Sequence, residues 1–169
     1  MFSLLSSSIR LDHVNPRMEK HGDEHVPAAD LKLTIRASND VLAEFDPNLK
    51  GAFYTRPDTP DLADEPNHLP KLRFPLMGKL KWAKEFVGYN LTWHAGVDER
   101  SDILLDLVDL DRFAFVCMEG GTVEVSFRAK CKPEPSVLGR LCAVMQGDIS
   151  VSLVPSESAS EVDGNGEED

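Results

Sequence analysis

The chain of 169 residues, 41% of them hydrophobic, has the length and apolar content of one ordinary domain with a single core. Its 11 glycines and 11 prolines favour turns and short elements and exclude a long helical bundle. Three cysteines without Cys-x-x-Cys spacing exclude a disulfide framework and a zinc knuckle. No apolar run has the length of a membrane span or a signal peptide, so we expect a cytoplasmic protein.

The formal net charge of −11 argues at first against a nucleic-acid partner, because binding phosphates requires local positive potential. The charge is uneven, however. Six acidic residues and no basic residue lie in the last fifteen positions, which leaves a net charge of −5 on the rest. Residues 71–86, the basic island, contain five basic residues and one acidic residue, a local balance of +4.

In chain order, alternation over residues 4–14 predicts a first strand. The polar stretch 15–25, with Pro16 and Gly22, predicts a loop. Alternation returns over residues 31–36 and predicts a half-buried strand.

A helical segment is expected next. Asn39 is suited to cap a short helix over residues 40–45, and Pro47 is suited to begin another that runs towards Tyr54. The four prolines and several acids of residues 55–70 predict an exposed loop.

The second half of the chain is rich in strand patterns. We expect strands over residues 71–77, 79–86, 89–95, 103–118 and 122–131, with turns at Val87-Gly88 and Gly120-Gly121. A helix from Ser136 to near Gly147 and a strand over 149–153 should follow. The predicted class is α+β, mostly antiparallel, with a β-rich domain over 1–154 and a disordered acidic tail over 155–169.

The basic island interleaves cations with aromatic residues. A turn at Val87-Gly88 would place Trp82 opposite Trp93, with Lys79 and Lys81 on the other face. Proteins that bind single strands combine cations along the phosphates with aromatic rings that stack on bases. The alternative is that both tryptophans belong to the core and the lysines to a solvated face.

The Gly120-Gly121 hairpin extends this hypothesis. A two-residue turn there would place Phe113 and Phe115 beside Arg128 and Lys130, on the face away from the core. The alternative is that a second layer covers both phenylalanines, and a register slip of one residue would exchange the two faces.

No catalytic or metal site is expected. His21 and His25 lie in a loop without a recognised ligand pattern, and Asp109 and Asp111 belong to an alternating acidic strand without a nuclease motif. No motif for Ser/His/Asp or Cys/His catalysis surrounds any candidate nucleophile. We therefore expect a non-enzyme without cofactor or metal.

With its Lys79-Leu80-Lys81-Trp82 segment, its glycine hairpin with Arg128 and Lys130, and its Glu167-Glu168-Asp169 ending, the chain resembles small acidic-tailed single-stranded DNA-binding proteins of phages and prophages. The resemblance implies an oligonucleotide-binding (OB)-type fold, sequence-tolerant binding, oligomerisation, and an accessory role in DNA replication or recombination in the host cytoplasm.

The expected partner is single-stranded DNA or RNA, bound by Lys79, Lys81, Trp82, Lys84, Trp93, Phe113, Phe115, Arg128 and Lys130. The acidic tail could compete with nucleic acid, recruit partner proteins or only aid solubility. The alternative function is a structural or protein-interaction module, such as a phage assembly factor, a host-factor binder or a DNA mimic.

Overall fold

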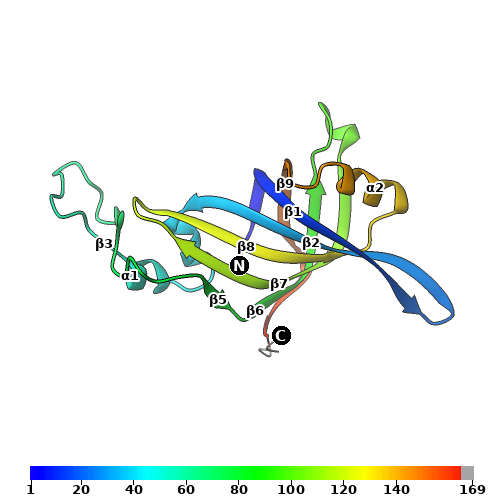
Figure 1. The fold of residues 1–169 in the computed structure, drawn as a ribbon, viewed down its shortest axis with the longest axis horizontal. Coiled ribbons are helices and arrows are strands. Elements are labelled where there is room, and N and C mark those ends of the chain that lie inside the picture. Colours follow the sequence, from blue (N-terminus) through cyan, green and yellow to red (C-terminus); the bar gives the residue numbers. More distant parts are fainter. Residues whose placement is uncertain (165–169) are drawn as a thin grey trace.

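An antiparallel sheet that closes on itself forms the body of the protein (Figure 1). The computed structural model describes residues 1–164. Around the ring the order is β7, β6, β9, β1, β2 and β8, and β8 pairs back with β7. These strands are β1 Leu4–His21, β2 Glu24–Ser38, β6 Lys84–Trp93, β7 Ile103–Cys117, β8 Thr122–Cys131 and β9 Asp148–Asp163. The mainly antiparallel β architecture agrees with the predicted class.

Short elements surround the ring. β5 (Leu80–Trp82) pairs with β7, while β3 (Tyr54–Thr55) and β4 (Lys71–Leu72) form a separate small sheet. The helical elements are the 3-10 turns η1 (Asn39–Glu44) and η2 (Glu99–Ser101) and the α-helices α1 (Leu49–Phe53) and α2 (Pro135–Ala143). Over the described residues, no helix is both long and apolar enough to cross a membrane.

The core lies inside the ring and is rich in phenylalanine. Alternation on β1, β2 and β8 turns residues such as Leu11, Leu33 and Phe127 inwards, where each is at most 2% exposed. Phe45, just after η1, packs on Phe115 with ring centroids 4.8 Å apart. Burial of one such side chain contributes about 1.5–3 kcal/mol. The helical segment after β2 therefore covers one part of the aromatic core.

The stretch expected to be a loop at 15–25 is instead part of a two-stranded arm. β1 and β2 remain paired from Asn15 opposite Asp30 to His21 opposite Glu24, and Gly22 adopts the left-handed φ of +62° that the tight turn requires. In Figure 1 this hairpin extends well beyond the ring. Hydrophobic alternation is missing there because an arm without a core on either face needs none.

The predicted turn at Val87-Gly88 is wrong. β6 runs through both residues, with Gly88 at a bulge where its φ is +79°. β5 and β6 both pair with β7 rather than with each other. Trp82 therefore lies opposite Phe113, and Trp93 lies opposite Ile103.

The hairpin at Gly120-Gly121 is confirmed, but its register differs from the prediction by one residue. Cys117 pairs with Val123 and Phe115 with Val125, because the turn has three residues rather than two and is closed by Met118 N donating to Thr122 O. The slip turns Phe113 and Phe115 to the inside of the ring, as the alternative register anticipated.

The end of the chain also differs from the prediction. Residues 155–163, expected to be disordered, continue β9 and pair with β6, from Tyr89 opposite Pro155 to Lys84 opposite Asp163. Lys84 Nζ also lies 2.6 Å from Glu161 Oε2. Backbone hydrogen bonds to β6 compensate for the low apolar content of this segment. The remaining part of the predicted tail, residues 165–169, lies outside the described residues.

Candidate nucleic-acid interface

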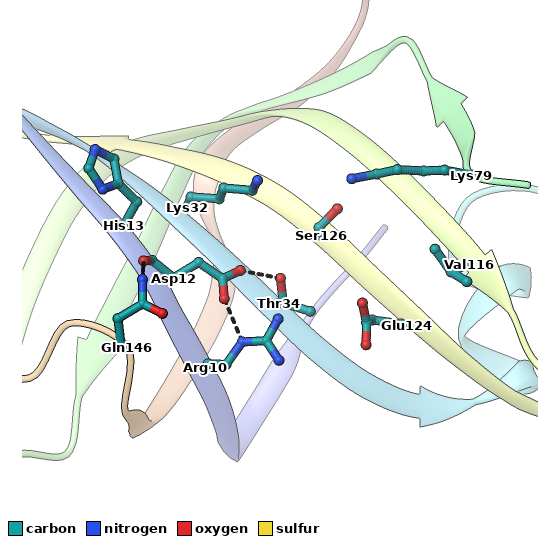
Figure 2. A pocket seen from close by; sticks show the side chains of 10 residues that line it. All are labelled: Arg10, Asp12, His13, Lys32, Thr34, Lys79, Val116, Glu124, Ser126 and Gln146. Carbon is teal, nitrogen blue, oxygen red and sulfur yellow. Dashed lines mark hydrogen bonds and ion pairs between the residues drawn. The ribbon is translucent and has the colours of Figure 1, made fainter.

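An open groove of about 400 Å³ crosses the outer face of β1, β2 and β8 and reaches the segment before β5 (Figure 2). Polar residues that alternate with core residues on these strands line most of it. The lining residues are Arg10, Asp12, His13, Lys32, Thr34, Lys79, Val116, Glu124, Ser126 and Gln146. The groove is therefore polar and open, and it contains no aromatic ring for a base to stack on except the imidazole of His13.

Two lysines line the groove from different parts of the chain. Lys32 on β2 and Lys79 before β5 extend towards one another over the hydroxyl of Ser126 on β8 (Figure 2). Both side chains belong to exposed residues. In the described part of the chain neither ammonium lies within 4.0 Å of a carboxylate. Two unpaired ammonium groups and a hydroxyl are a combination that attracts a phosphate or another anion.

One end of the groove is internally neutralised. Asp12 accepts hydrogen bonds from Arg10 Nε and from Thr34 Oγ1, and Gln146 Nε2 donates to the backbone carbonyl of Asp12. Partial burial opposes ionisation of Asp12, but these two side-chain hydrogen bonds outweigh it and lower its pKa. On the Lys79 side of the groove, Glu124 is paired with Arg36 at 3.1 Å. The lysines of the groove without an ion pair among the described residues are therefore Lys32 and Lys79.

The predicted lysines divide into two groups. Lys79 lines the groove, and Lys81, which faces Ala114 across β5 and β7, is exposed and makes no ion pair among the described residues. Lys84, in contrast, is engaged with Glu161. Lys79 and Lys81 thus stay candidates for phosphate contact, whereas Lys84 could contact a phosphate only after breaking its ion pair with Glu161.

Arg128 and Lys130 are held by a buried acid. Arg128 donates to both carboxylate oxygens of Asp111 at 2.7 and 2.6 Å, and Lys130 Nζ lies 3.1 Å from Asp111 Oδ2. Asp111 is 5% exposed. Burial opposes its ionisation, but hydrogen bonds from the two cations keep its pKa below the ordinary value. The two cations therefore neutralise Asp111 within the sheet and do not form an open phosphate site.

The prediction of an aromatic stacking platform is wrong for three of its four members. Phe113 and Phe115 are each 1% exposed, and Trp93 is 6% exposed beneath the guanidinium of Arg140, 5.1 Å from its ring centroid. Trp82 is half-buried, with its ring centroid 6.3 Å from that of Phe115. Both the register slip in the hairpin and the continuity of β6 turn these rings inwards.

Sequence reasoning missed most of the groove. Lys32 and Thr34 lie in the segment 31–36, which was expected only to form a half-buried strand, and no binding role was assigned to Arg10, Asp12 or Ser126. The polar alternation of β2 was the available signal. It does not say which strands lie beside β2, so it could not predict that Lys32 and Lys79 line the same groove.

A second polar constellation, also missed, joins β6, β9 and the start of β7. His94 Nδ1 lies 2.9 Å from Asp102 Oδ2, and its Nε2 lies 2.8 Å from Ser152 Oγ. No local motif marks these three residues, because cross-strand pairing alone brings them together. No group of three or more His, Cys, Asp or Glu side chains within residues 1–164 is arranged to hold a metal ion.

Comparison of the chain with protein-family models, curated proteins and solved structures gave no match.

Proposed function

We propose that the protein binds single-stranded nucleic acid through the lysines of the outer groove, with phosphate contacts rather than base stacking as the main source of affinity. The observation behind this proposal is that Lys32 and Lys79 extend into one groove from either side of Ser126, in a protein of net charge −11. Most other cations near the groove already face a carboxylate, as Arg10, Arg36 and Arg128 do. Lys81, two residues after Lys79 and on β5, would extend the same track.

Contacts of this kind do not read base sequence, so binding should be sequence-tolerant and strongly dependent on salt. The strand would be bound and not cleaved, and labelled DNA should stay intact in magnesium. An accessory role in replication or recombination, as the resemblance implies, is part of the same proposal.

The test measures anisotropy of a labelled mixed-sequence oligonucleotide, single-stranded and duplex, against salt concentration. For a single strand the slope of log affinity against log salt should be about −0.7 per phosphate neutralised, so losing three lysine contacts should flatten it by about 2. The variant is Lys32→Ala/Lys79→Ala/Lys81→Ala. Lys20→Ala on the arm, an exposed lysine without an ion pair in the described structure, is the matched control.

Two results would contradict the proposal: no binding at low salt, or equal losses in the triple variant and the Lys20→Ala control. Either would favour the alternative, a protein-interaction module. Two exposed apolar residues in the segment between β4 and β5 speak for that alternative, since Phe74 is 58% and Leu76 is 100% exposed.

A further inference from the structure

The hydroxyl of Ser152 lies in a hydrogen-bonded chain that fixes the position of its proton. Asp102 can only accept at Oδ2 when ionised, so His94 Nδ1 donates to it over 2.9 Å. In the neutral imidazole Nε2 is then the acceptor, and Ser152 Oγ donates to it over 2.8 Å. This is the arrangement of nucleophile, base and orienting carboxylate that activates a serine.

The strand register produces this arrangement. Trp93 pairs with Ile103 on one side and with Val151 on the other, so the next residue, His94, lies between Asp102 and β9. His94 N donates to Ser150 O at 2.9 Å, which places Ser152 diagonally across on the same outer face. His94 and Asp102 keep 27% and 22% of their side-chain surface exposed. The hydrogen-bonded chain of side chains is therefore reachable from solvent.

A strained backbone position contacts the same hydroxyl. Ser6 has a φ of +43°, which is unfavourable for a non-glycine residue, and lies where β1 bulges against β9. Its N–H donates to Ser152 Oγ at 2.9 Å. One lone pair of Oγ accepts from Ser6 and its proton is directed at His94, which leaves the second lone pair for attack. Strain of this kind tends to occur at functional sites.

From this geometry we infer that Ser152 is an activated nucleophile, with His94 as its base and Asp102 as the residue that positions His94, reactive towards small esters with an apolar acyl group. The apolar preference follows from two exposed neighbours. Leu5, in the bulge of β1, is 75% exposed, and Leu104 is 63% exposed. Thr92 pairs with Leu104 on one side and with Ser152 on the other, so only Thr92 separates them across the sheet. Their surfaces can accept a short acyl chain.

In the reaction, Ser152 Oγ forms a bond to the carbonyl carbon while its proton passes to His94 Nε2. The bond to the leaving alcohol then breaks, and His94 returns the proton to that alcohol. Water, with His94 again as base, releases the acid and restores the serine. This activity is independent of the proposed nucleic-acid groove, which lies on β1, β2 and β8.

The first experiment uses a fluorophosphonate probe on the full chain, with the labelled peptide located by mass spectrometry. Attack by Ser152 expels fluoride and leaves a stable phosphonyl ester. We expect one label at Ser152, none in Ser152→Ala, and unchanged labelling in Ser150→Ala, a serine on the same strand and face. His94→Ala should slow labelling by about 100-fold, the usual contribution of a general base. Labelling elsewhere, or none, would overturn the inference.

A second experiment separates reactivity from a merely structural role. In Ser152→Cys, His94 should draw the thiol towards thiolate, so iodoacetamide should modify it at least about tenfold faster than the cysteine of Ser150→Cys. Asp102→Asn in the Ser152→Cys background should remove much of that advantage, and Asp102→Glu should restore part of it. If the hydrogen bonds among Asp102, His94 and Ser152 only stabilise the connection between residues 94 and 102, the cysteines of Ser152→Cys and Ser150→Cys should be alkylated at equal rates. This outcome would hold even if the variants differ in melting temperature.

Discussion

The side chains of the basic island differ from one another in their structural roles. Trp82, expected to stack on a base, packs beside Phe115, and its Nε1 is buried without a hydrogen-bond partner among residues 1–164. Lys81, its neighbour, points to solvent. Composition identified this segment as unusual. It could not say which side chains face inwards, because that depends on pairing with β7.

Truncating Trp82 should destabilise the protein. Trp82→Ala removes packing against Phe115 and should cost about 2–3 kcal/mol, somewhat less than a fully buried tryptophan. Trp82→Phe should cost clearly less, because it keeps a ring in place and removes a buried N–H that has no partner. Lys81→Ala is the control, expected within about 0.5 kcal/mol of the parent. Urea unfolding followed by circular dichroism measures all three. Equal stability of Trp82→Ala and the parent would contradict the packing assignment.

Asp111 should make the protein sensitive to acid. Its pKa in the folded protein is lowered because the hydrogen bonds from Arg128 and Lys130 outweigh burial. The stability it supplies is therefore complete above its unfolded pKa of about 4 and is lost as pH falls through the lower folded value. Asp111→Asn should cost about 2 kcal/mol at pH 7 and much less near pH 2.

Glu124→Gln provides the comparison for Asp111→Asn. It breaks a surface pair in which the Arg36 side chain is 66% exposed, and it should cost under about 1 kcal/mol. Urea midpoints of the parent and both variants at the two pH values measure the effect. A cost for Asp111→Asn that does not shrink in acid would refute the role assigned to its charge.

At the scale of elements, the sequence located β2, β8 and the hairpin between β7 and β8, since clear alternation marks strands with one buried face. It missed the arm and the second half of β9, whose residues lack that alternation. The predicted helix over residues 40–45 is present as η1, although Ser38 rather than Asn39 caps it. The groove could not be predicted because its walls come from strands that are distant in sequence.

The second half of β9 should contribute to stability. A chain ending at Pro155 loses the Lys84 to Glu161 ion pair, the hydrogen bond from Ser156 Oγ to Gly88 O and the part of the ladder that pairs β6 with residues 160–163. We expect its melting temperature to fall by about 5 °C, as for a loss of roughly 2 kcal/mol. A chain ending at Gly164 keeps β9 and is the control. If both truncations melt like the full chain, the paired segment adds nothing to the fold.

At the scale of the whole molecule, closure of the ring joins distant parts of the sequence. β1 pairs with β9, as in Leu4 opposite Leu153, and β2 pairs with β8, as in Ser38 opposite Thr122. Forming such pairings costs the entropy of closing long loops before the ring is stable. Folding should accordingly take milliseconds to seconds, as for other proteins with mostly non-local contacts. Stopped-flow tryptophan fluorescence tests this, and refolding in microseconds would show that the ring is not formed in the rate-limiting step.

Ring closure also determines how the protein resists self-association through strand edges. Two free edges of the main sheet discourage such contacts: β5 has only three residues and an exposed lysine, and the arm carries Pro16 and Pro27, which lack a backbone donor. Separation of β2 from β8 would expose two long edges at once. Aggregation should therefore require separation of β2 from β8 rather than contact between folded molecules. Conditions that stabilise the closed ring should also prevent aggregation at high protein concentration.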